Sequence, residues 1–302
     1  MANRQAAVVG EDWARGLNRW HEAVLWRRRV AAQGRFFRRV FRNGCELETA
    51  WREHRAATQA VLRDGRVLVH GDRPGLAETL VEVWHHRGYT QGLYRAGGAG
   101  GLKRGKMAGK QAAVVVDAGA NVGVFAADVL RRQPGVRVLA IEPDAENLPA
   151  LRANLSAFGG SETDIIAGAL GPTSGEAVLV RSERSLDHRV AFDDVDVAEH
   201  RDQGPGRAVG ADGGSDRVEV VTLEGVMERA GVDRVALLKL DIEGAEYALL
   251  DAVSDAVLRR CERIAIEPHP RLTGRSVGEL VERLEGLFEV RAYGPLLQAR
   301  RR

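Results

Sequence analysis

From residue 112 onward, short runs of apolar residues alternate with segments that have helical periodicity. Continuous apolar runs that alternate with helices are typical of a mainly parallel sheet whose two faces are both covered. We therefore predict an α/β fold. The expected strands are Ala113–Val116, Val136–Ile141, Ile165–Ala169, Ala177–Val180, Val218–Val221, Val235–Leu240, Ile264–Glu267 and Phe288–Ala292. The expected helices lie near Val124–Arg132, Ala145–Phe158, 222–230, 244–258 and 276–286.

The N-terminal part has a different pattern. Apolar residues recur at three- and four-residue spacing over much of residues 11–63, which predicts helices there. Residues 27–42 are rich in arginine, with phenylalanines interspersed among the arginines. This stretch fits a basic surface for RNA or an acidic partner, but we favour an amphipathic cap whose arginine stems cover the core. We divide the chain into a helical, Arg-rich extension at 1–66 and a second domain at 67–302.

At the start of the second domain, the sequence pattern indicates secondary structure less strongly. Val67–His70 predicts a short strand, Leu76–His85 a helix, and residues 96–110 a loop rich in glycine and lysine. Residues 183–216 interrupt the alternation with an acidic stretch followed by several glycines. Insertions of this length inside a domain are either functional or disordered, and both alternatives stay open here.

Composition narrows the class of protein. The chain has 302 residues, 44% apolar and 28% charged, so it can bury a substantial core. Its net charge of +2 implies no general attraction to nucleic acid or membranes. The two cysteines are far apart, which argues against a disulfide framework or a zinc site. No apolar run approaches the roughly 20 residues that span a bilayer, and we expect a soluble, cytoplasmic protein.

The first strong motif joins a strand to a helix through a turn of small residues, DAGANVG at 117–123. Such a turn lets a ligand approach the backbone at the carboxyl end of the sheet. The spacing is not that of a dinucleotide fingerprint, and Asp117 would repel a pyrophosphate. A cationic ligand such as S-adenosylmethionine would be favoured instead. Glu142, at the end of the next strand, is placed to accept two hydrogen bonds from ribose hydroxyls.

Together with four later segments, this motif resembles the FkbM family of S-adenosylmethionine-dependent methyltransferases. The further matching segments are EPDAENLPALRANL (142–155), VEVVTLEGVM (218–227), LLKLDIEGAEYALL (237–250) and IAIEPHP (264–270), with EVWHHRGY (82–89) upstream. The resemblance covers roughly residues 76–293. It implies a Rossmann-like class I methyltransferase fold with a mostly parallel seven-stranded sheet. It also implies S-adenosyl-L-methionine as cofactor and a hydroxyl as the usual acceptor.

The resemblance assigns five residues to the cofactor. Glu142 would bind the ribose, and the other four form the loop at its methionine side: Asp117, Gly119, Asn121 and Gly123. Asn147 and Asn154 also match, but hydrogen bonding at helix ends explains them at least as well.

Candidate catalytic residues follow two later strands. Asp241 and Glu243 lie in KLDIEGAE after the strand expected at Val235–Leu240, and His269 follows the strand expected at Ile264–Glu267. Methyl transfer to an alcohol needs alignment of the nucleophile and removal of its proton, which each of the three could assist. An imidazole has a pKa suited to that task near neutrality. Paired carboxylates also suit a divalent metal, but the sequence shows no complete ligand set, so we predict none.

We therefore predict an S-adenosylmethionine-dependent methyltransferase that acts on a hydroxyl of a small molecule, a secondary metabolite or a sugar. One alternative is methylation of RNA or of a carrier-bound or other macromolecular substrate. Another is a catalytically degenerate protein that uses the fold as a binding module. We expect a small-molecule acceptor as the partner, no membrane and no nucleic acid, and the sequence does not fix the oligomeric state.

Overall fold

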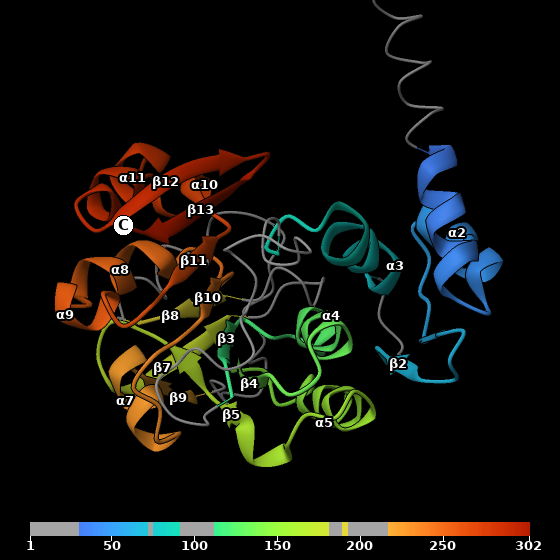
Figure 1. Cartoon of the computed structure of the whole chain (residues 1–302), viewed down its shortest axis with the longest axis horizontal. Helices are drawn as coiled ribbons and strands as arrows, with labels where there is room; N and C mark the ends of the chain where they lie inside the picture. Colours follow the sequence, from blue (N-terminus) through green and yellow to red (C-terminus); the bar gives the residue numbers. More distant parts are fainter. Residues whose placement is uncertain (1–29, 72–74, 91–111, 181–188, 193–216) are drawn as a thin grey trace, which may run out of the picture.

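A seven-stranded sheet forms the centre of the molecule (Figure 1). The computed structural model describes residues 30–71, 75–90, 112–180, 189–192 and 217–302. In this part of the chain the strand order is β12-β13-β11-β10-β3-β4-β5, and only β13 runs in the direction opposite to the other strands. The predicted α/β fold is confirmed. The strands are β3 (Val114–Ala118), β4 (Arg137–Glu142), β5 (Ile165–Ala167), β10 (Leu237–Leu240), β11 (Arg263–Ile266), β12 (Phe288–Tyr293) and β13 (Leu296–Arg301).

The order of the strands reverses at β3. The chain passes from β3 to β4 on one side, and later returns to place β10 on the other side of β3. In open parallel sheets, ligands bind at such a reversal, beyond the carboxyl ends of the strands. A ligand site is therefore expected at the carboxyl ends of β3, β4 and β10.

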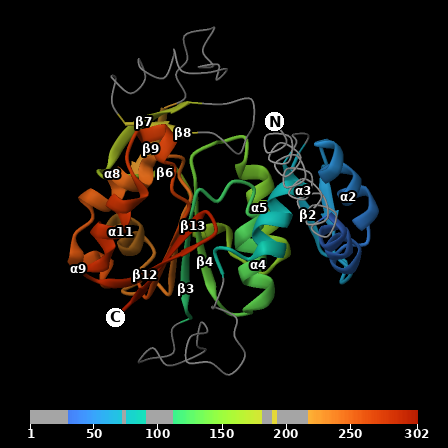
Figure 2. The same ribbon diagram turned by 90° about the horizontal axis from the view of Figure 1, so that it is seen from above.

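Helices cover both faces of the sheet (Figure 2). Val115 belongs to the apolar core on one face, whereas Val114 and Val116 belong to the core on the other. Burial on both faces explains why the strands read as continuous apolar runs. One face is covered by α3 (Leu76–Thr79), η1 (Leu80–His86), α4 (Val124–Arg132) and α5 (Leu148–Ala157). The other is covered by α7 (Leu223–Arg229), α8 (Ala245–Ala252), α9 (Asp255–Leu258) and α11 (Val277–Glu285).

A second, four-stranded sheet corrects part of the prediction. The apolar runs at 177–180 and 218–221 do not join the main sheet, and the run at 165–169 is split between the two sheets at Gly168. A Cβ atom at Gly168 would lie 2.8 Å from the carbonyl oxygen of Glu219, so the backbones cross closely there. The order is β6-β9-β7-β8, with β6 (Ala169–Leu170), β7 (Gly175–Val180), β8 (Arg189–Ala191) and β9 (Arg217–Val221).

The N-terminal part is not helical throughout. Residues 30–40 and α2 (Gly44–Glu53) are helices, but β1 (Gln59–Val61) pairs with β2 (Val67–Val69) in a hairpin. The prediction of a helix to residue 63 was wrong because it overlooked the Asp64-Gly65 turn, in which Gly65 has a φ of 95°. The predicted domain boundary at 66/67 falls inside this hairpin.

Several smaller elements differ from their predictions. The helix expected at 76–85 continues as the π-helical η1, and the helix expected at 244–258 is interrupted at Val253, where Ser254 caps α9. Strand β13, the short helix α10 (Pro270–Thr273) and the 3-10 turn η2 (Glu162–Asp164) had no sequence signal that we used.

Other predictions fall outside the described residues: the first 29 residues, with the start of the Arg-rich stretch, the loop at 96–110, and most of the insertion at 183–216. In the part of the chain that the structure describes, no helix is long and apolar enough to cross a membrane.

Candidate active site

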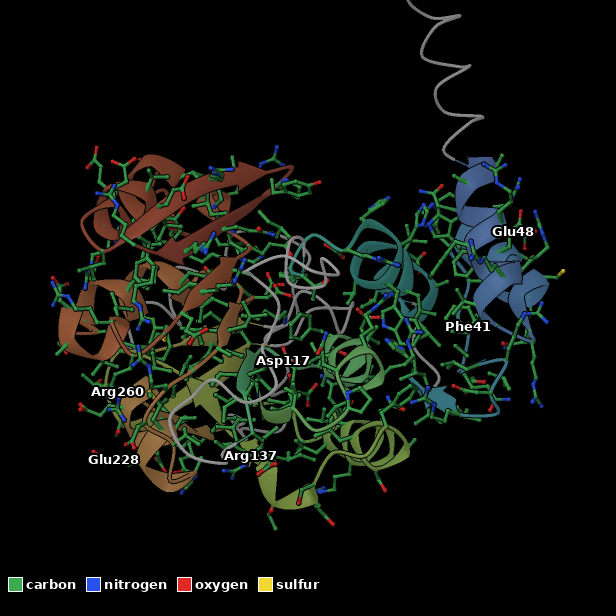
Figure 3. All side chains as sticks on the ribbon, in the orientation of Figure 1. Phe41, Glu48, Asp117, Arg137, Glu228 and Arg260 are labelled. Carbon is green, nitrogen blue, oxygen red and sulfur yellow. The ribbon has the colours of Figure 1, made fainter. Side chains whose placement is uncertain are left out.

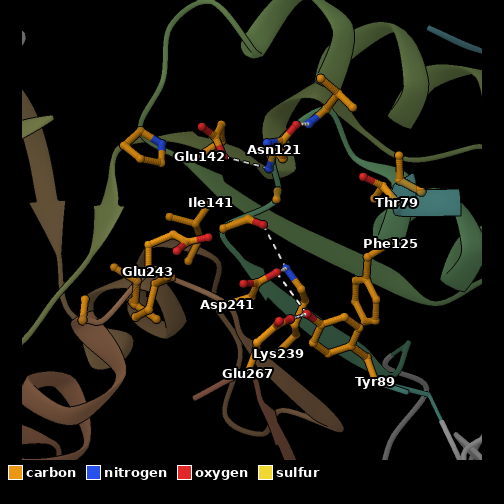
Figure 4. A pocket seen from close by; sticks show the side chains of 18 of the residues that line it. Thr79, Tyr89, Asn121, Phe125, Ile141, Glu142, Lys239, Asp241, Glu243 and Glu267 are labelled. Atoms are coloured by element: carbon orange, nitrogen blue, oxygen red, sulfur yellow. Dashed lines mark hydrogen bonds and ion pairs between the residues drawn. The ribbon is translucent and has the colours of Figure 1, made fainter. Parts of the chain in front are cut away.

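A cavity of about 320 Å³ opens at the carboxyl ends of β3, β4, β10 and β11 (Figure 4). It lies at the reversal of strand order, where the fold predicts a ligand site. One end is lined by the loop after β3 and by Glu142, and the other by Tyr89, Asp241, Glu267 and His269. The helix η1 closes one side. The cavity thus has a loop end and an acidic end.

The loop end depends on two glycines in left-handed backbone conformations. Gly119 has a φ of 73°, and a Cβ atom there would lie 1.8 Å from the carbonyl oxygen of Asp241. Gly123 has a φ of 83°, and its Cβ atom would lie 2.7 Å from Leu151. Glycine is therefore required at both positions. Asn121 also has a positive φ, of 50°, and its side-chain oxygen accepts a hydrogen bond from Val122 N at 2.7 Å.

Glu142 holds the loop in this shape. Its carboxylate accepts hydrogen bonds from Asn121 N at 2.7 Å, Asp144 N at 2.9 Å and the Asn147 amide at 3.1 Å. Burial raises the pKa of the Glu142 carboxyl, and these donors oppose the rise. A carboxylate has about four acceptor positions, so these donors leave about one for a ligand rather than the two expected from the sequence. Asn147, which the sequence left undecided, has a structural role here.

Asp117 lies behind the loop instead of facing the cavity. It is fully buried near the middle of the molecule (Figure 3), and its oxygen lies 3.2 Å from Lys239 Nζ. Lys239 also lies 3.2 Å from Asp241 and donates to the Gly119 carbonyl at 2.9 Å. Burial alone would lower the pKa of Lys239, but the two carboxylates raise it above its ordinary value. Asp117 and Lys239 thus join β3 to β10, and direct contact of Asp117 with a cofactor stays a prediction.

Three side chains at the acidic end were not singled out from the sequence. The Tyr89 hydroxyl donates to Asp241 at 3.1 Å and is also hydrogen-bonded to Glu267. Burial and the nearby carboxylates raise the pKa of Tyr89 well above its ordinary value, so the hydroxyl keeps its proton. Glu82 is exposed at the cavity wall, yet partial desolvation and the charges of Glu267 and Asp241 raise its pKa to about 7. All three lie in quoted segments, 82–89 and 264–270, so a signal existed.

His269 stands between two carboxylates. Its Nδ1 lies 2.8 Å from Glu246, and its Nε2 lies 3.4 Å from Glu243. Glu246 is fully buried and accepts hydrogen bonds from Ile242 N and Gly244 N, both at 3.0 Å. Burial lowers the pKa of His269, but these carboxylates outweigh it and raise the pKa to about 9. The imidazole of the ligand-free protein is therefore protonated at neutral pH, contrary to the ordinary value assumed from the sequence.

The structure brings the predicted catalytic residues together. Ligand atoms of Asp241, Glu243 and His269 lie within 4.8 Å of one another, although 28 positions separate the first from the last in the chain. All three line the cavity, as do Gly119, Asn121 and Glu142. Gly123 supports the loop from below, against α5. Their individual roles stay predictions.

Known proteins are similar to this chain in sequence. AmbE, the AMB antimetabolite synthetase of Pseudomonas aeruginosa, is 27% identical over 194 residues, which are 55% of this chain and 9% of that protein. The 31-O-demethyl-FK506 methyltransferase FkbM of Streptomyces tacrolimicus is 28% identical over 57% of this chain and 71% of its own length. Methyltransferase sdnD of Sordaria araneosa is 30% identical over 51% of this chain and 65% of its own length.

Solved structures are more distant. The precorrin-6y C5,15-methyltransferase of Geobacter metallireducens has 16% identity and a TM-score of 0.32, over 64% of this chain and 81% of that one. The pyocyanin biosynthetic protein PhzM has 15% identity and a TM-score of 0.31, over 67% of this chain and 54% of its own.

Residues 117–293 match the family described as the Methyltransferase FkbM domain. This range begins at Asp117, contains the loop at 117–123 and Glu142, and runs through Asp241, Glu243 and His269. It covers more than half of the chain. The residues that build the cavity and the residues that match are thus largely the same, and the protein belongs to the FkbM methyltransferase family.

Proposed function

We propose that the protein is an S-adenosylmethionine-dependent O-methyltransferase that acts on a hydroxyl of a small molecule. The observation that supports this most is the cavity with two unlike ends at the carboxyl edge of the sheet. A cavity of this size falls at the lower end of the range of about 300–1,000 Å³ for small-molecule sites. Family membership supports methyl transfer, and the acidic end supports a protic acceptor.

At the loop end, the cofactor would bind against backbone rather than against charged side chains. Gly119 and Ala120 let the ligand approach closely, and the remaining acceptor position of Glu142 suits one ribose hydroxyl. The sulfonium and ammonium groups carry positive charge, which the surrounding carboxylates favour.

At the acidic end, the acceptor oxygen would attack the methyl carbon opposite the sulfur. The carbon–sulfur bond breaks, the carbon–oxygen bond forms, and S-adenosylhomocysteine leaves without the positive charge. The hydroxyl proton goes to one of the carboxylates or to the imidazole at this end. We place this role among Asp241, Glu243 and His269. Because His269 is already protonated at neutral pH, it needs to lose that proton before it can act as a base.

Calorimetric titration with S-adenosylmethionine tests the first step of the proposal, with NAD and ATP as controls. We expect selective binding with a Kd near 1 μM, which corresponds to roughly −8 kcal/mol. The Glu142→Ala variant should bind more weakly by about 1.5–3 kcal/mol, the range of hydrogen bonds to charged groups. Absence of binding by folded protein would favour the non-catalytic module, and preference for NAD would refute the cofactor.

Transfer itself is tested with S-adenosylmethionine that carries a labelled methyl group, against a panel of hydroxyl-bearing metabolites and sugars. Label in an alkali-stable ether product supports O-methylation. Label found on nitrogen or carbon would contradict the acceptor class while it leaves methyl transfer intact.

A groove rich in arginine supports a second candidate, methylation of RNA. The groove lies on the outer side of η1, away from the cavity, and Phe36 and Trp84 line it together with cationic side chains. Of these, Arg38 pairs with Glu48, and Arg131 and Arg132 pair with Asp128. The arginines are Arg35, Arg38, Arg39, Arg87, Arg131 and Arg132.

Filter binding to polyuridylate at increasing salt distinguishes this candidate. Salt-sensitive binding that weakens in an Arg35→Ala, Arg39→Ala double variant would support a polyanionic substrate. If the filter retains no polyuridylate at low salt, the RNA candidate is wrong, and the arginines then form the amphipathic cap expected from the sequence.

A further inference from the structure

Asp241, Glu243 and His269 converge from two loops on one point of the cavity wall. Asp241 and Glu243 follow β10, and His269 follows β11. Their ligand atoms lie within 4.8 Å of one another, and all three side chains line the cavity. We propose that these three side chains bind one divalent cation, Mg²⁺ or Mn²⁺, at the acceptor end of the cavity. The use of this cation in catalysis rests on the function proposed above.

The histidine is oriented as metal-binding histidines are. Glu246 accepts the Nδ1 proton at 2.8 Å and is itself held by two backbone N–H groups. This contact fixes the ring and leaves Nε2 directed towards Glu243 and the cavity, where a bound cation would take the place of the Nε2 proton. A carboxylate behind a histidine is the usual support of a metal ligand, because it orients the ring and raises its basicity. Glu246 is fully buried, so it acts as a positioning residue and does not itself reach the cavity.

The two carboxylates also have the capacity to coordinate. Lys239 and Tyr89 both contact Oδ2 of Asp241, at 3.2 and 3.1 Å. No contact with its Oδ1 is found among the described residues, so that oxygen is available. Glu243 adopts a φ of 52°, a costly conformation for a residue with a side chain. The Glu243 carboxylate lies 3.4 Å from His269 Nε2 at the cavity wall.

The charge of the cavity gives an independent argument. Within the described part of the chain, seven carboxylates line the cavity or support its walls, and Lys239 and His269 are the cations beside them. S-adenosylmethionine would add a net charge of about +1, so a large negative excess would persist. Partly buried charges of one sign destabilise a site unless cations compensate them. The carboxylates are Glu82, Asp117, Glu142, Asp241, Glu243, Glu246 and Glu267.

The ligand set indicates which cation fits. The two carboxylates suit the hard cations Mg²⁺ and Mn²⁺, and the borderline imidazole favours Mn²⁺ of the two. Three protein ligands leave positions for water and for the acceptor hydroxyl. A bound cation would hold that oxygen in line with the methyl group and lower the pKa of its hydroxyl, so that its proton passes to a neighbouring carboxylate as the carbon–oxygen bond forms.

Titration of the full chain with Mn²⁺ tests the site directly. The protein is treated with EDTA, freed of chelator, and titrated while electron paramagnetic resonance measures unbound Mn²⁺; calorimetry measures S-adenosylmethionine in parallel. We expect one saturable site per chain. Glu243→Gln and His269→Gln should abolish it, and Glu246→Gln, which removes only the support, should weaken it by about 10- to 100-fold. Glu224→Gln, which removes an exposed carboxylate on α7, is the matched control and should leave it unchanged.

The outcomes separate this proposal from the proposed function. Unsaturable Mn²⁺ binding by the wild-type protein, or equal binding by wild type and Glu243→Gln, overturns the cation site even when S-adenosylmethionine binds well. Saturable Mn²⁺ binding together with no affinity for S-adenosylmethionine supports the site and overturns the proposed function instead. Thermal unfolding of each variant confirms that loss of binding reflects loss of a ligand and not of the fold.

Discussion

Replacement of Lys239 by methionine tests how the two central strands are held together. The ammonium is buried between Asp117 on β3 and Asp241 after β10. Methionine has a similar length and keeps the contact with the rings of Tyr89 and Phe125, but it removes the charge and the hydrogen bonds to the loop. Asp117 is then left in the interior with no opposite charge.

The magnitude follows from burial. Asp117 is 0% exposed, whereas the side chain of Asp241 is 26% exposed and keeps its contact with Tyr89. The cost therefore falls mainly on Asp117. Loss of one partner of a buried ion pair costs about 3–5 kcal/mol, because the remaining charge is uncompensated. A second substitution, Asp117→Asn, removes that charge, and the double variant should regain most of the loss.

The pH dependence has a definite sign. Burial already raises the pKa of Asp117 above its ordinary value, although Lys239 opposes the rise. Without Lys239 the pKa should rise further, so the folded variant binds a proton that the unfolded chain has released. The deficit of Lys239→Met should therefore grow as pH rises above about 4, the value in the unfolded chain, and shrink in acid.

Urea unfolding followed by tryptophan fluorescence measures these differences as shifts in the midpoint at constant slope. A loss below about 1 kcal/mol for Lys239→Met would refute the argument, because it would fall within the range of exposed ion pairs. A double variant as unstable as the single one would refute it as well, since the penalty would not then come from the charge of Asp117.

Three further changes probe the loop, its support and the core. Gly119→Ala places a methyl group 1.8 Å from the Asp241 carbonyl oxygen and should abolish S-adenosylmethionine binding in calorimetry. Gly159 also has a positive φ, of 85°, but no atom lies within 4 Å of its Cβ position, so Gly159→Ala is the control and should bind S-adenosylmethionine normally. Asn154→Ala removes the partner of the buried Val122 carbonyl and of the part-buried N–H and carbonyl of Val69. It should cost about 1–3 kcal/mol for the buried group left unsatisfied in urea unfolding, and an unchanged midpoint would contradict this. Burial raises the pKa of the Cys261 thiol to about 12, so iodoacetamide at pH 8 should label only the exposed Cys45 of the native protein, as measured by mass spectrometry. The free energy of unfolding should lose the contribution of this thiol only above the pKa of the unfolded chain, about 8.5. Labelling of Cys261 in the native protein would refute its assignment as a buried, protonated thiol.

Much of the central sheet could be predicted because its strands are buried on both faces. Val114–Ala118 and Leu237–Leu240 are continuous apolar runs, and such runs have few alternatives when helices flank them. Two failures differ in origin. The hairpin of Gln59–Val61 and Val67–Val69 had a local signal, the Asp64-Gly65 turn, that the helical periodicity obscured, whereas nothing local shows that the chain changes sheet at Gly168 to pair with a strand near Val220. Pairing, not propensity, decides these segments.

The candidate site could likewise be predicted only in part. Gly119 and Gly123 could be recognised because a tight turn after a strand needs glycine at set positions. Tyr89 lies in a matched segment, but its role could not be assigned, because its contacts with Asp241 and Glu267 span more than 150 positions of sequence. The pKa of His269 was likewise beyond the sequence, since it depends on Glu246, which lies 23 positions away. The backbone requirements of a tight turn can be predicted from the sequence, whereas the pKa values of interacting side chains depend on the fold that brings them together.

The charges of the cavity are arranged so that its two ends differ. Asp117 is neutralised by Lys239, and Glu142 is occupied by three donors, so the loop end offers little free negative charge. The other carboxylates that line the cavity, Glu243 and Glu82 among them, gather at the other end, beyond the place where the sulfonium would lie. If their purpose were only to attract the cofactor, the charge would be expected at the loop. Its concentration at the acceptor end instead favours a role in holding a second cation and in receiving the acceptor's proton.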